Sequence, residues 1–421
     1  MSPTVKKISL IVVFFLLIGA LGFALWVLFF KPTTPVVPTP QPGTEFPGGF
    51  PTPPTGTVTP PGEVTPPGTL PPSTGIIVPS DVIPGQTPAS PFSLGLDGGI
   101  AIADTVVSTR SSFVQPASNG SGFVFYDNET GLFKRFTDQG QVDIMTTRSF
   151  QDVKNVAWAP KTDKAVLEFS DGSNIIYNFA TNESFTLPSQ FEDFSFSPVG
   201  DKIAAKDLKL NKEDRWLVVV DDKGKNKTQV EHLGENEDRV QVQWNPNNQI
   251  IATSAKSIDG NRAEVIFLNE NQVQYTKAII QGRDLKYQYS PNGNKMLYSV
   301  YNPNSNYLPT LWITSSDPQA IDSGRLDTGL NTWADKCDFS NESTIYCAVP
   351  KEIGKYSGIL RSNNESDDDI YAIDTQTGRA TLASTLLIPS EISSLKVSAD
   401  GTKLYYVDED SQEVNSVDIT Q

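Results

Sequence analysis

The residues FSFSPVGDKIA, at positions 194–204, read as a short alternating strand, a tight turn and a second strand. Versions of this unit recur along the chain. Similar units begin with WAP at 158–160, WNP at 244–246 and YSP at 289–291, and the last begins with VSADG at 397–401. The prolines of the first four units lie 38, 48 and 45 residues apart. The sequence therefore repeats one supersecondary unit with a period of about 40 to 50 residues.

Most copies contain three or four strand-like segments, and six clear copies follow a degenerate one at 113–136. Residues 94–421 number 328, which gives about 47 residues for each of seven units. This pattern predicts an all-β, seven-bladed β-propeller, with six blades as the alternative. The last unit lacks a fourth strand. Either Ile100–Ala103 or Thr105–Ser108 could supply it and close the ring, which would remove an exposed sheet edge.

The turns FSPVG at 196–200, YSPNG at 289–293 and VSADG at 397–401 resemble the W-S-P-D-G turn of TolB-type, WD40-like (PD40) propeller repeats. The resemblance covers residues 150–421 and implies the propeller fold. Only Asp400-Gly401 keeps the Asp-Gly pair, and asparagine or glutamate replaces it elsewhere. Because propellers of one fold serve many functions, the resemblance implies no particular partner.

The N-terminal region differs in composition from the repeats. Residues 8–30 are 23 consecutive uncharged positions, about 35 Å as a helix, and they predict a transmembrane anchor. The alternative is a cleavable signal peptide, but no small-residue cleavage site ends the run. Lys6 and Lys7 precede it, so residues 1–7 are expected in the cytoplasm and the rest of this single-pass protein outside.

Residues 31–93 form a predicted disordered linker between the anchor and the propeller domain at 94–421. Positions 32–93 contain 19 prolines and 8 glycines, a composition that favours extended polyproline II and buries little apolar surface. The linker is interpreted either as a stalk that lifts the domain away from the membrane or as a passive spacer. Only three of the 49 acidic residues precede residue 94, so the domain has 46 acidic against 30 basic residues. Such a surface repels phosphate and disfavours nucleic-acid binding.

Two residue types limit the chemistry that the chain can perform. His232 is the only histidine, and its place near a strand end indicates a surface residue; no G-x-S-x-G elbow accompanies it. Cys337 and Cys347 are equidistant from the centre of the turn at 340–344. A symmetric hairpin would place them opposite each other, so they are predicted either to form a disulfide or to be two buried thiols. No cofactor and no metal site is predicted. The acidic run 367–369 could hold calcium, but it lacks the spacing of an EF-hand and is interpreted as solvated.

A carboxylate precedes the first strand of six successive units. The six are Asp152, Asp193, Asp238, Asp284, Asp335 and Glu391. They are interpreted either as a ring at one mouth of the channel, which would bind a cation or cationic ligand, or as residues that cap the loop entering each strand. The connections between second and third strands are long at 207–214, 255–262, 301–310 and 350–369, and they are expected on the same face. Insertions on one face are typical of a binding surface, although loops also tolerate insertion without a function.

Four residues of these long connections are candidate partner contacts, because tyrosine and arginine are enriched at interfaces: Tyr301, Tyr307, Tyr356 and Arg361. The sequence therefore favours a membrane-anchored, extracytoplasmic propeller that serves as a non-catalytic binding or scaffold module. Its partner would be a protein, peptide or glycan at the cell envelope. The alternative is a propeller-type hydrolase or lyase that uses carboxylates at the channel mouth.

Overall fold

The computed structural model describes residues 92–93, 98–137, 139–271, 277–321, 324–361 and 366–419. The chain divides into two units, Met1–Val82 and Ile83–Gln421, and all described residues belong to the second. The predicted cytoplasmic tail, transmembrane segment and nearly all of the linker lie outside the described residues. Within them, no helix has the length and apolar character that crossing a membrane requires.

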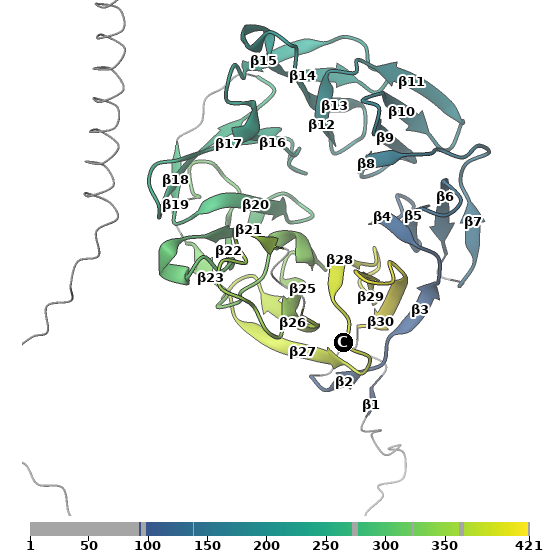
Figure 1. The fold of residues 1–421 in the computed structure, drawn as a ribbon, viewed down its shortest axis with the longest axis vertical. Coiled ribbons are helices and arrows are strands. Elements are labelled where there is room, and N and C mark those ends of the chain that lie inside the picture. The colour runs from purple at the N-terminus through teal and green to yellow at the C-terminus, as the bar shows by residue number, and fades with distance from the viewer. Residues whose placement is uncertain are drawn as a thin grey trace, which may run out of the picture. The chain divides into compact units, whose positions relative to one another are not determined.

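The described part of the second unit is all-β and forms seven sheets arranged radially (Figure 1). Blade 1 consists of β4 (Ser111–Pro116), β5 (Phe123–Asp127), β6 (Leu132–Phe136) and β7 (Val142–Ile144). Blade 2 consists of β8 (Val153–Trp158), β9 (Lys164–Phe169), β10 (Asn174–Asn178) and β11 (Glu183–Leu187). Blade 3 consists of β12 (Phe191–Phe196), β13 (Lys202–Asp207), β14 (Trp216–Asp221) and β15 (Thr228–His232).

Blades 4 to 7 continue in the same order, and the first strand of each is the innermost. They consist of β16 (Val240–Val242), β17 (Ala252–Ser257), β18 (Ala263–Leu268) and β19 (Ala278–Ile280); β20 (Arg283–Tyr289), β21 (Lys295–Tyr301), β22 (Thr310–Ser315) and β23 (Leu326–Asp327); β24 (Cys337–Phe339), β25 (Thr344–Pro350), β26 (Asp368–Asp374) and β27 (Ala380–Leu386); and β28 (Ile392–Val397), β29 (Lys403–Asp408) and β30 (Val414–Asp418). The prediction of seven blades is confirmed, and the six-bladed alternative is wrong.

The ring is closed by a strand from the beginning of the domain. β3 (Asp104–Val107) pairs antiparallel with β30 and gives blade 7 its fourth strand (Figure 1). The Thr105 hydroxyl donates to Asn415 Oδ1 at 2.7 Å across this pair. Of the two closing segments that the sequence offered, the one near 105–108 performs this role. The other contributes β2 (Ile100–Ala101), which pairs with β27 of blade 6 and with β1 (Phe92–Ser93).

The hydrophobic core is distributed around the ring. Seven clusters of buried apolar side chains occur within the described residues, and each joins two neighbouring blades. The cluster between blades 7 and 1, for example, packs Val107 of β3 against Phe123 and Tyr405. The second strands are almost entirely buried because neighbouring blades cover both of their faces, which explains their near-continuous apolar sequence.

The repeated turn is stabilised by the same hydrogen bond in three blades. Ser197, Ser290 and Ser398 are buried, and each hydroxyl oxygen accepts from the backbone N–H five residues later, at 3.1, 3.1 and 2.9 Å. The fourth residue of the turn is left-handed, as in Gly293 at φ +75°. In the WNP unit, where asparagine stands in place of glycine, Asn248 adopts φ +66°, a conformation that asparagine tolerates. This replacement therefore preserves the left-handed backbone of that turn.

Candidate functional site

One end of the propeller carries the long connections. Because each blade is antiparallel, the start of its innermost strand and the end of its second strand lie at the same end; Arg283 at the start of β20, for instance, pairs with Tyr301 at the end of β21. We call this end the loop face. It holds the connections 208–215, 302–309 and 351–367, as predicted, whereas the repeated turns lie at the opposite end. The connection expected at 255–262 is shorter, at 258–262, because β17 continues to Ser257.

The six predicted carboxylates all lie at the loop face, and half of them share one backbone conformation. Asp152, Asp193 and Asp284 have φ values of 56°, 54° and 55°, next to an irregularity where the innermost strand shifts register against its neighbour. Aspartate enters this left-handed region more readily than most residues. The recurrence of aspartate at these three positions therefore has a local backbone explanation.

The other three positions have different settings. Asp238 lies in the 3₁₀ helix η2 (Glu237–Arg239), Asp335 lies in η4 (Ala334–Lys336), and Glu391 immediately precedes β28. Burial raises the pKa of Glu391 above its usual value; Lys336 opposes this shift, and the carboxylates of Asp368, Glu409 and Asp410 add to it. Among the described residues, no three histidine, cysteine, aspartate or glutamate side chains gather in a way that could hold a metal ion.

Several of the carboxylates face a basic neighbour. Asp193 forms an ion pair with Lys206, Asp284 lies 3.9 Å from the Lys286 ammonium, and Asp335 accepts from Arg361 at 2.6 Å. All three acids are about half exposed, so each pair contributes only about 0–1 kcal/mol to stability. The pairs do reduce the negative charge that these three positions present. A shared cation-binding role for the six remains a prediction.

The three candidate tyrosines come together where blades 5 and 6 meet at the loop face. The Tyr307 and Tyr356 rings stack with centroids 5.2 Å apart, and the Tyr301 ring lies 6.3 Å from that of Tyr307. Tyr301 ends β21 and Tyr307 lies in the β21–β22 connection, whereas Tyr356 belongs to the β25–β26 connection. We call Tyr301, Tyr307 and Tyr356 the tyrosine cluster. Residues about fifty positions apart thus form one aromatic surface.

The backbone that carries this cluster is strained and fixed in place. Tyr307 and Tyr356 have φ values of 59° and 69°, which are uncommon for bulky residues. The Gly358 N–H donates to Tyr307 O at 2.8 Å. A Cβ at Gly358 would lie 2.6 Å from the Tyr301 Cβ, so only glycine permits this approach of the two connections. Asn302 begins η3 (Pro303–Ser305) with a capping box, which orders the other connection.

Exposed apolar side chains border the cluster on the same connection. Tyr356, Ile359 and Leu360 are 51, 47 and 53% exposed. Arg361 follows them, and its guanidinium lies 4.8 Å from the centroid of the Trp333 ring while it donates to Asp335. The structure therefore places Arg361 beside the predicted carboxylate Asp335. The sequence analysis did not identify Trp333 as a site residue, although Trp333 lies only two residues before the predicted carboxylate Asp335.

A buried ion pair supports this part of the loop face. The Lys336 ammonium donates to both oxygens of Asp368 at 2.7 Å, and the side chains are only 2 and 0% exposed. Asp368 also accepts from the Ile392 N–H of blade 7 at 2.7 Å. Burial raises the pKa of Asp368, and it lowers that of Lys336, against their mutual attraction. The interpretation of the acidic run 367–369 as solvated is wrong for Asp368, because Lys336, far away in sequence, reaches it.

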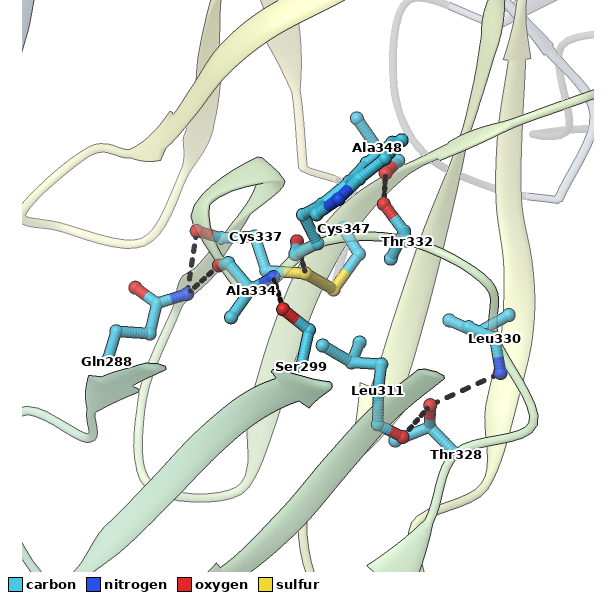
Figure 2. The surroundings of a disulfide bond; sticks show 11 residues. Gln288, Ser299, Leu311, Thr328, Leu330, Thr332, Ala334, Cys337, Cys347 and Ala348 are labelled. Atoms are coloured by element: carbon cyan, nitrogen blue, oxygen red, sulfur yellow. Dashed lines mark hydrogen bonds between the residues drawn. A yellow bond between two sulfur atoms is a disulfide. The ribbon is translucent and has the colours of Figure 1, made fainter. Parts of the chain in front are cut away.

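A disulfide links the two strands next to η4 (Figure 2). Cys337 and Cys347 are direct partners in the β24–β25 pair, as the symmetric hairpin requires, and the structure joins their sulfur atoms. Around them, Gln288 of blade 5 donates to the carbonyls of Ala334 and Cys337 at 2.7 and 2.9 Å, and Ser299 accepts from the Ala334 N–H. Blade 5 is therefore fastened to the segment that presents Trp333 and Asp335.

No protein-family model matches this chain, and no curated protein matches it. Among solved structures, the β-propeller domain of Cps50 (Swd1) from Myceliophteria thermophila superposes with a TM-score of 0.53 at 10% identity, over 76% of this chain and all of that one. An oligogalacturonate lyase in complex with manganese superposes with a TM-score of 0.52 at 11% identity, over 72% of this chain and 87% of that one. Identities this low show the fold alone, and the fold is a β-propeller.

Proposed function

We propose that the protein is a non-catalytic binding or scaffold module of the TolB-like type, which binds a protein partner through the loop face of blades 5 and 6. The segment at 8–30 would anchor it in the membrane, with residues 1–7 in the cytoplasm and the propeller outside. Supporting sequence observations are the long uncharged N-terminal run, the lysines before it and the repeated turns. The propeller itself, with its ordered loop face, provides the binding surface.

The observation that carries the proposal is the stacked pair Tyr307–Tyr356 with its left-handed backbone. Backbone strain costs roughly 1–3 kcal/mol for each such residue, and strained residues cluster at functional sites. Here the strain presents two rings and the neighbouring Ile359 and Leu360 to solvent. Tyrosine and arginine dominate the energetics of protein interfaces, and both lie here within one connection. A protein partner therefore fits this surface better than a small substrate does.

Site-specific photocrosslinking tests the proposal. A benzoylphenylalanine placed at position 356 or 360 of the full chain in its own cells should give one discrete crosslinked protein. The matched control is position 199, where Val199 is 60% exposed in a repeated turn at the opposite end. If positions 356 and 360 yield no adduct, or only those that position 199 also yields, the loop face is not the binding surface.

The membrane topology is tested separately. On intact cells, an external protease should digest the propeller region, while a tag placed before Lys6 should be protected until the membrane is permeabilised. Protection of the propeller would refute the extracytoplasmic orientation but would leave the crosslinking result valid.

A further inference from the structure

A cavity of about 400 Å³ lies between blades 3 and 4, away from the tyrosine cluster. One wall comes from blade 3 and the connection that leaves it, from the end of β15 to η2. The other wall is the face of blade 4 formed by β17 and β18. A volume of this order falls within the usual range for small-molecule sites. The cavity is independent of the protein-binding surface proposed above.

The floor of this cavity is apolar. Leu233, Val240 and Leu268 line it and are buried, and the half-buried Ile266 lies above Leu268 on the same face of β18. Glu264 follows on that face towards the loop face. The wall therefore changes from apolar to charged along one strand. A ligand that fits it has an apolar body and a charged or polar head.

The mouth of the cavity is richer in basic than in acidic groups. Three basic side chains, Arg239, Lys256 and Lys277, face two carboxylates, Glu231 and Glu264. Glu264 accepts from Lys277 at 2.9 Å and is the cross-strand partner of Lys256. Within the described residues, neither Arg239 nor Lys256 makes an ion pair, which leaves two cations against Glu231. This is a local reversal of charge in a domain with 46 acidic and 30 basic residues.

We infer that the cavity binds a small carboxylate with a compact apolar body, such as an aryl or short alkyl acid. The carboxylate lies at the mouth with Arg239 and Lys256, and the apolar body packs over Leu233, Ile266 and Leu268. Guanidinium is suited to this head group because its paired N–H donors match the two oxygens of a carboxylate. The apolar floor then distinguishes such a ligand from inorganic anions.

The experiment uses the full chain in lipid nanodiscs, with empty nanodiscs as the reference. Ligand-observed saturation-transfer NMR compares phenylacetate, phenethylamine and phenethyl alcohol, which share an aromatic body but carry a negative, a positive and no charge. Phenylacetate should bind most tightly, and acetate should not compete with it. If phenethylamine binds as well as phenylacetate, or if acetate displaces phenylacetate, the assignment is overturned.

Two variants locate the site. Arg239→Glu with Lys256→Glu should weaken phenylacetate binding by at least about tenfold, because both cations are replaced by repelling charges. Both side chains are exposed, so the fold should tolerate the change. The matched control, Lys161→Glu with Lys223→Glu, makes the same change in net charge at exposed sites away from the cavity, and binding should stay the same.

A size change provides an independent check. Ser254 is half-buried on the cavity wall, and Ser254→Phe should fill the space and abolish phenylacetate binding. Binding that survives both Ser254→Phe and the double charge reversal would place phenylacetate elsewhere and refute the inference. Loss of binding in the Lys161→Glu/Lys223→Glu control would refute it as well, since the effect would then come from net charge alone.

Discussion

Gly293 illustrates how single residues lock neighbouring blades together. Its carbonyl accepts from the side-chain amides of Asn245 and Asn247 in blade 4, at 3.1 and 2.8 Å. A Cβ at Gly293 would lie 2.0 Å from Asn245 Oδ1 and 2.5 Å from the Asn247 nitrogen. Glycine is therefore required for two reasons, the left-handed φ and the close approach of blade 4.

Gly293→Ala should lower the free energy of unfolding by clearly more than the roughly 1 kcal/mol expected from the left-handed φ alone. Gly172→Ala is the matched control, because Gly172 has φ +82° with no atom within 4 Å of a Cβ. Urea denaturation of both variants measures the difference. Equal losses would show that the contact with blade 4 does not constrain this turn.

The buried Lys336–Asp368 pair gives a second prediction at this scale. Lys336→Met should destabilise the fold by about 3–5 kcal/mol, because an unpaired carboxylate would remain buried. Burial already raises the pKa of Asp368, and the loss of Lys336 should raise it further. A carboxyl whose folded pKa exceeds its unfolded value loses stability as pH rises between the two values. The loss should therefore shrink as the pH is lowered from 7 towards 4.

The double variant Lys336→Met/Asp368→Asn is the control for this pair. It removes the buried charge, and the amide oxygen can still accept from the Ile392 N–H, so it should recover part of the stability at pH 7. Urea denaturation at several pH values checks both variants. A loss in Lys336→Met that is independent of pH would contradict this account of Asp368.

At the scale of elements, a disulfide constrains the β24–β25 hairpin of blade 6. The disulfide closes a loop with a sequence separation of 10 residues, in a cluster that also includes Leu311 and Ile345. Closing a loop of this length stabilises a fold by about 2–3 kcal/mol in the chain-entropy description. The hairpin in turn positions η4, which carries Asp335 and Lys336.

Cys337→Ala with Cys347→Ala should therefore lower the free energy of unfolding by about 2–3 kcal/mol. Urea denaturation with and without reductant measures it. Reductant should lower the urea midpoint of the wild-type protein, because the disulfide becomes accessible once unfolding begins. It should leave the midpoint of the double variant unchanged. A wild-type midpoint that does not respond to reductant after full unfolding and refolding would argue against this contribution.

For the whole molecule, closure of the ring depends on one short strand. β3 comes from the start of the domain, yet it completes blade 7 at the end of the chain. Without it, β30 would expose an unpaired edge, and blades 7 and 1 would lose Val107 from the cluster that they share. The stability of the closed ring should therefore be sensitive to changes in these few residues.

Val107→Asp should destabilise the domain by about 3 kcal/mol or more and favour aggregation, because it buries a charge between two blades. Asp104→Asn on the same strand is the control, since Asp104 is exposed and should tolerate the change. Urea denaturation and size-exclusion chromatography measure the two effects. A Val107→Asp variant as stable and monomeric as the control would show that closure by β3 is dispensable.

The sequence by itself determined the repeat and the end of the molecule at which the long connections lie, and it favoured seven blades over six. It could do so because a strand-turn-strand unit is local, and its alternation and its left-handed turn residues are readable within about ten positions. The register of Cys337 with Cys347 followed from the same local symmetry. The sequence also indicated the recurring aspartates at 152, 193 and 284, but it did not show that they share a left-handed backbone conformation.

Only the tertiary structure decided which distant residues meet. Tyr307 and Tyr356 stack because blades 5 and 6 are neighbours, and Asp368 is buried because Lys336 reaches it from η4. The cavity between blades 3 and 4 likewise combines segments that no local pattern connects. Contacts between blades depend on how side chains of two repeats fit together, and a periodic sequence specifies the order of the repeats but not that fit.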